Sequence, residues 1–340
     1  MARPPAVRRQ LRSLRPAPTP PVVTLDEALI AAAGYAKASR SAATWRAYEA
    51  DWRAFNAWCR AVDLLAMPAT PHTVALFLAA EAKLGRAPST LGRRLAAIRL
   101  MHVGARHSSP HDAIEVDEVL RGIRRTWKRP KAQKAPAVDD EIKRMVDAVA
   151  PQTLRGLRDR ALLLLGFAGA FRRSELVALD ADHVTERDEG LSMRIASSKT
   201  DQEGLGQVVA IPRVTGSPYC PVRAVLDWMI VANIQTGPVF RRLHRGDTVG
   251  QSRLSPQSVA LIIKDLAGKV GLDASRYAGH SLRSGFLTSA ARNHASIFKM
   301  ADQSRHKSLD VLREYVRNEE RFEDHAASGL LQPNSTARRS

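Results

Sequence analysis

The chain has 340 residues, of which 44% are hydrophobic and 25% are charged, a composition typical of a globular protein with room for two ordinary domains. Its 52 Lys and Arg residues outnumber 34 Asp and Glu residues, and the formal charge of +18 favours a polyanionic partner such as nucleic acid. The best apolar run, Ala161 to Ala170, is too short to cross a bilayer, and two cysteines exclude a disulfide framework and a cysteine-rich zinc site.

The first 22 residues form a distinct segment of the sequence. They hold five arginines, several prolines and no acidic residue, and they lack the continuous apolar core of a secretory signal. Such a composition is shared by transit peptides and by basic DNA-binding arms. Because the prolines disfavour a stable helix, residues 1–22 are predicted to be a disordered basic arm.

Residues 23–127 have a helical pattern throughout, which predicts an amino-terminal helical bundle. Trp45, Trp52, Phe55 and Cys59 recur at helical spacing along one stretch and are interpreted as core-packing residues. The later stretch 88–105 carries arginines on one face and, as far as residue 111, no acidic residue. A solvated charged face would explain this pattern, but phosphate contact suits it better.

Residues 128–136, KRPKAQKAP, are predicted to be a linker, because they combine prolines and cationic residues without an apolar cluster. The second domain is predicted to span 137–340. Its stretch 154–171 is almost wholly apolar and is expected at the centre of a core. Alternation in 190–200, followed by 207–212, predicts a β-hairpin with Lys199 near its turn.

Four residues near the end of the chain have side chains that suit phosphodiester cleavage. His280 and Arg283 lie three residues apart, followed by His306 and, on a short amphipathic helix, Tyr315. A tyrosine hydroxyl can attack a phosphate only if cations favour its ionised form, since its reference pKa is about 10. Each residue alone has an ordinary explanation, either a solvated surface charge or a half-buried packing tyrosine.

The order and spacing of these residues are more specific. Arg172 in AFRRSEL and Lys199 in the hairpin precede them, His306 lies nine residues before Tyr315, and Arg283 lies thirty-two before it. This pattern resembles that of the tyrosine recombinase (phage integrase) family, and residues 24–331 resemble Cre recombinase and its relatives.

The resemblance implies a mainly α fold that forms a C-shaped clamp on DNA. The amino-terminal bundle would be a SAM-like core-binding domain. The catalytic domain would be mixed and mostly helical, with a small antiparallel sheet. After Tyr315, a terminal helix at about 319–331 would dock into a neighbouring protomer, unless it packs on its own domain.

The resemblance also implies a role for each site residue. Arg172 and Arg283 would clamp the scissile phosphate with bidentate guanidinium geometry, and Tyr315 would form a 3′-phosphotyrosyl link. The remaining residues would assist: Lys199 by protonating the departing 5′ oxygen, His280 in proton transfer with the tyrosine, His306 by donating to the phosphate, and Glu175 by pairing with Arg172. Neither ATP nor a metal ion would be required.

Double-stranded DNA with paired inverted-repeat half-sites is the implied partner, bound by a homo-tetramer on two sites through a Holliday junction. The protein would act in the cytoplasm of a bacterium, encoded by the cell, a phage or a plasmid, and no membrane is implied. The residues expected to contact DNA are Thr44, Arg46, Ser89, Thr90, Arg93, Arg94 and Gln257, with ordinary surface polarity as the alternative for each.

Two departures from the family pattern are present. Arg305 replaces the glycine that usually precedes the second histidine, and Arg173 adjoins Arg172, which is preferred because it lies three residues before Glu175. Two alternative functions share the fold: a catalytically inactive DNA-binding or architectural protein, and a type IB topoisomerase-like enzyme that relaxes DNA. Retention of all the catalytic residue types disfavours the first.

Overall fold

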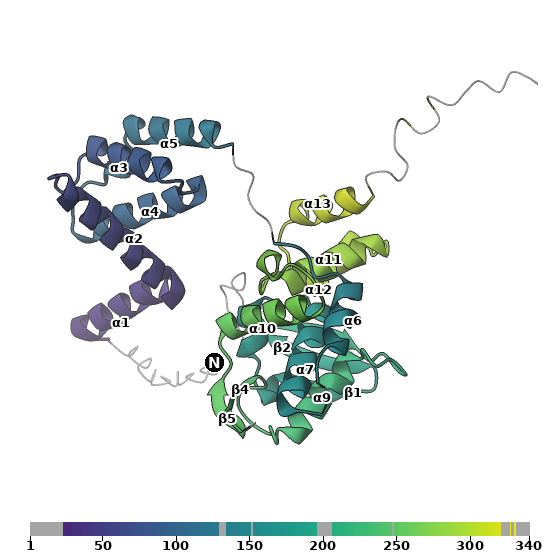
Figure 1. The fold of residues 1–340 in the computed structure, drawn as a ribbon. Helices are drawn as coiled ribbons and strands as arrows, with labels where there is room; N and C mark the ends of the chain where they lie inside the picture. The colour runs from purple at the N-terminus through teal and green to yellow at the C-terminus, as the bar shows by residue number, and fades with distance from the viewer. Residues whose placement is uncertain are drawn as a thin grey trace, which may run out of the picture. The chain divides into compact units, whose positions relative to one another are not determined.

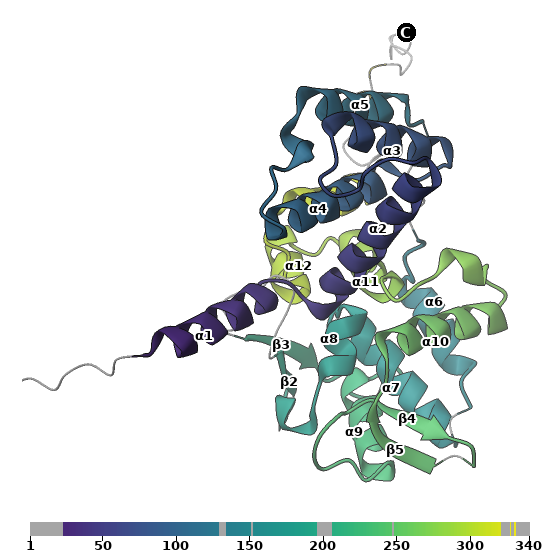
Figure 2. The ribbon, with the colours of Figure 1, turned by 90° about the vertical axis from the view of Figure 1, so that its left-hand side faces the viewer.

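The computed structural model describes residues 23–128, 134–150, 152–195, 206–246, 248–320, 327 and 330 (Figures 1 and 2). The chain forms two compact units, residues 1–130 and 131–340. The predicted linker, 128–136, spans the division between them. The predicted arm, 1–22, and most of the linker lie outside the described residues.

The first unit is helical, as predicted. Its core includes Phe55 from the aromatic seam of the second helix and Phe77 from the third helix. The two ring centroids lie 5.0 Å apart, and both side chains are fully buried. Side-chain caps begin several helices, as at Ser41 and at Thr70 before Pro71. The helices are α1 (Leu25–Ala38), α2 (Ala42–Ala61), α3 (Pro71–Lys83), α4 (Pro88–Gly104), η1 (Pro110–Asp112) and α5 (Ile114–Thr126).

The second unit is mostly helical with two small antiparallel sheets. Its elements are α6 (Asp139–Asp147), α7 (Leu154–Ala168), α8 (Arg173–Ala178), η2 (Ala181–His183), β1 (Val184–Arg187), β2 (Gly190–Ile195), β3 (Gln207–Pro212), α9 (Pro221–Val231), β4 (Arg241–His244), β5 (Thr248–Arg253), α10 (Pro256–Lys269), η3 (Ala274–Arg276), α11 (Ser281–Arg292), α12 (Ile297–Ser304) and α13 (Asp310–Glu319).

Helix α7 lies at the centre of the second unit, as its apolar sequence predicts. Leu162, Leu163 and Leu165 are fully buried, and the helix packs against α6, α9, α10 and α11 (Figure 1). Helix α11 lies very close to the segment before α6. A Cβ atom added at Gly285 would be only 1.8 Å from the Ala137 carbonyl oxygen. Only glycine permits this approach, which helps to position the helix that carries Arg283.

The predicted β-hairpin is present as β2 and β3, which pair in register at Leu191 with Ile211 and Met193 with Val209. All four of these side chains are buried. The turn that contains Lys199 lies outside the described residues. Two features were not predicted: β1 adds a third strand to this sheet, and β4 pairs with β5 in a second sheet.

The last three helices share a small apolar cluster separate from the main core. Leu287 on α11, Met300 on α12 and Leu312 on α13 are almost fully buried, and Tyr315 packs at the margin of this cluster. Residues 321–326 are outside the described part of the chain, so the predicted terminal helix at 319–331 stays a prediction. No described helix is long and apolar enough to cross a membrane.

Candidate active site

Arg172 and Glu175 lie at the start of α8 and form an ion pair with each other. Arg172 is the residue before the helix, and its backbone N–H donates to Glu175 Oε2 at 2.9 Å. Its guanidinium Nη1 donates to the other carboxylate oxygen. Glu175 is 3% exposed. Its carboxylate caps the start of α8 and orients the Arg172 side chain that precedes the helix.

Arg305 binds the same carboxylate, although it lies 130 residues later in the sequence. Its Nη2 lies 2.8 Å from Glu175 Oε2, and its guanidinium stacks over the Phe171 ring at 5.1 Å. Burial raises the pKa of Glu175, but the charges of Arg305 and Arg172 outweigh burial and hold that pKa below its usual value. Glu175 is therefore ionised at neutral pH and shared between two arginines.

Arg305 also explains how the chain departs from the family pattern. It follows α12 with φ 59° and ψ 43°, the left-handed conformation that favours glycine. The turn before His306 is thus present without glycine, and the Arg305 side chain, 6% exposed, turns inward. Its Nη1 donates to the carbonyl oxygens of Gly169 and Gln303 at 3.0 and 2.7 Å.

Arg283 is the most deeply buried of the site arginines, at 1% exposed. Its Nη1 donates to the Ala170 carbonyl at 2.8 Å, and the same carbonyl accepts from Arg305 at 3.1 Å. Burial, then the charges of Arg172 and Arg305, lowers the pKa of Arg283 to about 9. The guanidinium remains protonated at pH 7, but its positive charge is poorly compensated, which favours binding of an anion.

His306 lies beside this guanidinium. Arg283 Nη2 is 3.3 Å from His306 Nδ1 and 3.4 Å from Nε2, and Ser304 Oγ is 2.7 Å from Nδ1. Burial lowers the pKa of His306 to about 4, with further lowering by Arg283, Arg172, His280 and Arg305 in that order. The imidazole is therefore neutral at pH 7 in the free protein.

His280 and Tyr315 flank this network. His280 is exposed and precedes α11, so its ring does not share the burial of Arg283 three residues later. Tyr315 is half-buried on α13; burial raises the pKa of its phenol, and the Arg283 charge acts in the opposite direction. The phenol is therefore protonated at neutral pH. Lys199 lies outside the described residues.

Arg172, Arg283 and His306 thus belong to one continuous network. Arg172 and Arg305 share Glu175, Arg305 and Arg283 share the Ala170 carbonyl, and Arg283 contacts His306. The sequence pattern identified Arg305 only as a departure from the family and predicted no role for Ser304 or Ala170. The position of Ser304 two residues before His306 could have indicated a contact with that ring. Ala170 contributes a backbone carbonyl, which the pattern of side chains cannot reveal.

The residues expected to contact DNA have unequal exposure. Arg46 and Ser89 are exposed, while Thr44 and Thr90 are partly buried near the starts of their helices, α2 and α4. In the second unit, Gln257 is exposed in the first turn of α10.

Acidic side chains bind both of the α4 arginines that are expected to contact DNA. Arg93 is half-exposed, and its Nε donates to Asp51 Oδ2 at 2.7 Å. Arg94 is 8% exposed and pairs with Glu81 at 2.7 Å. In the free protein Arg94 is therefore not available to a phosphate, whereas Arg93 presents its charge at the surface.

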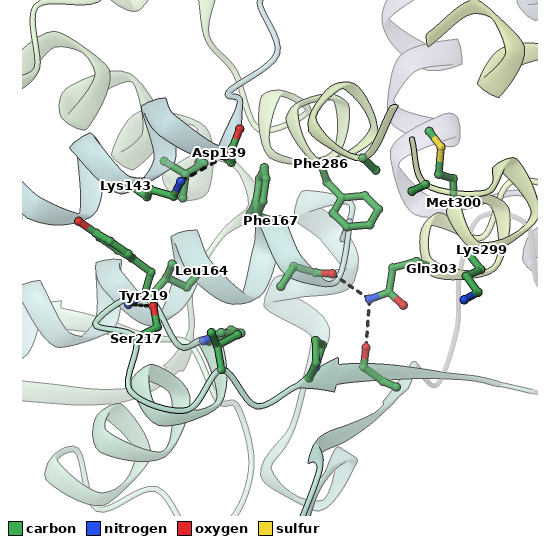
Figure 3. Close-up of a pocket in the computed structure, with 18 residues that line it drawn as sticks. Asp139, Lys143, Leu164, Phe167, Ser217, Tyr219, Phe286, Lys299, Met300 and Gln303 are labelled. Atoms are coloured by element: carbon green, nitrogen blue, oxygen red, sulfur yellow. Dashed lines mark hydrogen bonds and ion pairs between the residues drawn. The ribbon is translucent and has the colours of Figure 1, made fainter. Parts of the chain in front are cut away.

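A separate cavity of about 560 Å³ lies in the second unit (Figure 3). Its lining is mainly apolar and includes Leu164, Phe167, Phe286 and Met300. At its edge Gln303 Nε2 donates to the carbonyl oxygens of Ala168 and Ala210 at 2.8 and 3.0 Å, as the dashed lines in Figure 3 show. No residue of the arginine network lines this cavity.

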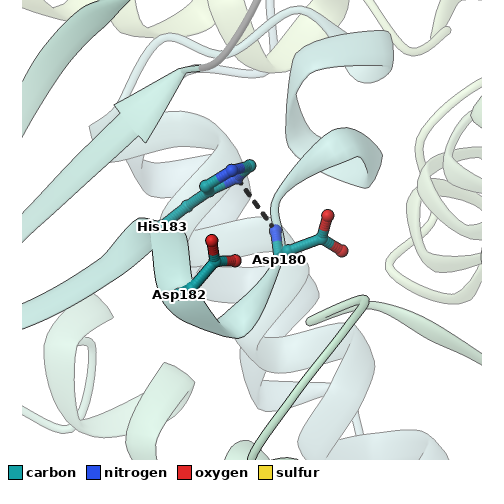
Figure 4. A group of neighbouring side chains, drawn as sticks. All are labelled: Asp180, Asp182 and His183. Atoms are coloured by element: carbon teal, nitrogen blue, oxygen red, sulfur yellow. Dashed lines mark hydrogen bonds between the residues drawn. The ribbon is translucent and has the colours of Figure 1, made fainter.

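Asp180, Asp182 and His183 also lie together (Figure 4). His183 Nδ1 accepts from the backbone N–H of Asp180 at 3.2 Å. Arg253 binds Asp180 at 2.7 Å and Arg194 binds Asp182 at 3.3 Å. Because arginines already balance the two carboxylates, this group does not need a metal ion.

Comparison with known proteins places these features in context. The pattern of the Phage integrase family matches residues 138–321. The integrase/recombinase XerD homolog of Selenomonas ruminantium is 37% identical over 298 residues, 86% of each chain, whereas recombinase Cre of Escherichia phage P1 is 22% identical over 81% of this chain and 84% of its own. A lambda integrase dimer bound to a COC′ core site has the same fold, with a TM-score of 0.58 at 14% identity over 88% of this chain and 97% of that chain.

Proposed function

Because the chain belongs to the phage integrase family and is a tyrosine recombinase that carries out site-specific recombination, we propose that it cleaves and rejoins DNA through Tyr315. The observation that supports this site is the network in which Arg172 and Arg305 share Glu175, and Arg305 and Arg283 share the Ala170 carbonyl. Three guanidinium groups and one carboxylate leave a positive charge that a DNA phosphate would neutralise.

In the proposed reaction, the Tyr315 phenol oxygen attacks the scissile phosphorus. The new oxygen–phosphorus bond forms as the bond to the 5′ oxygen breaks, which leaves a 3′-phosphotyrosyl link. His280 would accept the phenol proton, and Lys199 would donate a proton to the departing 5′ oxygen. A 5′ hydroxyl of the partner strand then reverses the step, so bond energy is conserved without ATP and strand exchange proceeds through a Holliday junction.

Each cation would stabilise charge that grows during the attack. Arg172 and Arg283 would hold the non-bridging phosphate oxygens, where a guanidinium can make two parallel hydrogen bonds. His306 would add a third contact to the same phosphate. Because burial raises the pKa of Tyr315 in the free protein, we expect the phenol to lose its proton during the attack rather than before it.

The DNA interface is proposed to extend to the first unit. Arg46, Ser89 and Arg93 present polar or cationic side chains at the surface of α2 and α4, and we propose that Thr44 and Thr90 contact DNA from the same helices. Gln257 would contact DNA from the second unit. Arg94 is left out of this set because its guanidinium is buried against Glu81.

The proposed assembly is a homo-tetramer on two DNA sites, each built from inverted-repeat half-sites in cytoplasmic DNA. The terminal segment at 319–331 carries Phe322, Ala326 and Leu330 at helical spacing, and we propose that it docks on a neighbouring copy. The apolar cavity of Figure 3 is the surface we assign to it, because its lining matches such an apolar stripe.

Substitution of Tyr315 by Phe tests the proposed nucleophile. DNA flanking the gene would first be screened for a bound inverted repeat, and a nicked form of that site would trap the covalent product. The wild type is expected to form a protein–DNA adduct, while Tyr315→Phe binds the site with similar affinity and forms none.

Tyr35→Phe provides a matched control, since this tyrosine is exposed on α1 of the first unit and belongs neither to the arginine network nor to the cavity of Figure 3, and it should retain adduct formation. An adduct formed by Tyr315→Phe would show that another residue is the nucleophile. Relaxation of supercoiled DNA without the site would favour the topoisomerase-like alternative, and binding without any wild-type adduct would favour the inactive DNA-binding protein.

A further inference from the structure

Ser304 occupies an unusual place directly before the turn that carries His306. It is the last residue of α12 and is fully buried. Its Oγ lies 2.6 Å from the Met300 carbonyl oxygen and 2.7 Å from His306 Nδ1. Both contacts are short enough to be good hydrogen bonds.

The number of hydrogens decides the direction of these two bonds. A serine hydroxyl has one hydrogen, and a carbonyl oxygen can only accept. The bond to Met300 therefore uses the Ser304 hydrogen, and the contact with His306 requires a hydrogen on Nδ1. Ser304 Oγ then accepts from the imidazole, which leaves the proton of a neutral His306 on Nδ1 and a lone pair on Nε2.

Arg283 approaches both nitrogens of the ring. Its Nη2 lies 3.3 Å from Nδ1 and 3.4 Å from Nε2, and a guanidinium can only donate. Arg283 therefore does not by itself choose between the tautomers. With the proton held on Nδ1 by Ser304, the lone pair on Nε2 is the one that can accept from Arg283.

We propose that Ser304 is a positioning residue that fixes the ring of His306 and holds a proton on Nδ1, so that Nε2 faces Arg283 in the free protein and, once protonated, the phosphate. This inference rests on the proposed role of His306 at the scissile phosphate. In this arrangement Ser304 contacts no reacting atom and acts only through the imidazole. When a phosphate binds, its negative charge would favour uptake of a proton from solvent at Nε2. Nε2–H then donates to a phosphate oxygen, while the bond from Nδ1–H to Ser304 keeps the ring in place.

A double-mutant cycle tests whether Ser304 acts through His306. Ser304→Ala should slow single-turnover adduct formation about fivefold, the usual effect of losing one hydrogen bond, with little change in the Kd for DNA. In a His306→Ala background, the same change should have no additional effect. An unchanged rate for Ser304→Ala, or an equal loss in both backgrounds, would overturn the proposal.

Ser284→Ala calibrates the structural contribution. Ser284 is also buried and also donates to a carbonyl four residues earlier, that of His280 at 3.1 Å. Both serine variants should show similar losses of thermal stability, so a rate loss specific to Ser304→Ala cannot come from stability alone.

The tautomer can be measured without any reaction. In free protein labelled with ¹⁵N-histidine, His306 Nδ1 should resonate in the protonated range and Nε2 in the unprotonated range, and Ser304→Ala should shift both toward the average. The reverse assignment in the wild type would refute the inference even if adducts form. Absence of wild-type adduct on its bound site would instead refute the proposed function.

Discussion

Each unit of the protein contains a pair of adjacent arginines beside a candidate phosphate-binding position, Arg93–Arg94 in the first and Arg172–Arg173 in the second. In the first unit, carboxylates match the arginines: Arg93 pairs with Asp51, and Arg94 pairs with Glu81. Each of these two arginines has its own carboxylate, the third cation, Arg86, lies exposed beside Glu81, and the cluster ties α2, α3 and α4 together. We interpret it as part of the architecture of the first unit.

In the second unit, cations outnumber their partners. Among the described residues, Arg172 and Arg305 share the single carboxylate of Glu175, and Arg283 has only carbonyl and imidazole contacts. The cost of burying this excess charge is visible in the lowered pKa of Arg283. The balance of charged partners, rather than the presence of arginine, therefore distinguishes the candidate phosphate site.

The largest expected effect comes from removing the least compensated arginine. Arg283→Ala should lower the rate of adduct formation on the order of 10³-fold, as loss of a preorganised charge contact does in other sites. Single-turnover cleavage at saturating DNA measures this loss. Arg283→Lys should remain impaired because lysine lacks the guanidinium fork. A rate within tenfold of wild type for Arg283→Ala would remove the distinction between the two clusters.

Arg305→Gly separates the backbone role of this position from its side-chain role. Glycine keeps the left-handed turn but leaves Glu175 with Arg172 alone, so we expect a loss of about 3 kcal/mol in unfolding free energy. Urea denaturation measures it, with exposed Arg173→Ala as a control expected to change stability by about 0.5 kcal/mol or less. A variant as stable as wild type would mean that only the turn matters.

Arg94→Met tests the balanced cluster. The loss of stability should be smaller, about 1–2 kcal/mol, because Arg93 remains beside Asp51 and Arg86 remains 3.4 Å from Glu81. Adduct formation at saturating DNA should be unchanged. Binding measured at several salt concentrations should keep its slope; a slope lower by about one would show that Arg94 does contact a phosphate.

The smallest expected effect concerns the neutral state of His306. Its pKa is lowered to about 4, mainly by burial and then by Arg283, while an unfolded histidine titrates near 6.5. As the pH falls from 6.5 toward 4, the unfolded state takes up a proton that the folded state does not, so stability decreases.

The unfolding free energy of His306→Asn should therefore fall less than that of the wild type between pH 7 and pH 4.5. The difference should be on the order of 1 kcal/mol, after allowance for the partial exposure of the ring. Exposed His107→Asn in the first unit is the control. Equal pH profiles for wild type and His306→Asn would show that the excess charge does not act on this ring.

Local sequence patterns determined much of the architecture. The aromatic seam of α2, the apolar run of α7 and the alternation of β2 each depend on neighbouring residues, because helices and strands bury one face at a fixed period. Strands β4 and β5 were missed since RRLH and TVGQSR contain few β-branched or aromatic residues. Their pairing depends on contacts with each other.

The sequence also determined which residue types stand at the candidate site, through the order and spacing of Arg172, His280, Arg283, His306 and Tyr315. Only the tertiary structure decided how their charges are balanced. Glu175 is 130 residues from Arg305, and Glu81 is thirteen from Arg94. Ion pairs form through space, so one buried arginine became a structural residue while another was left with the uncompensated charge that a phosphate can neutralise.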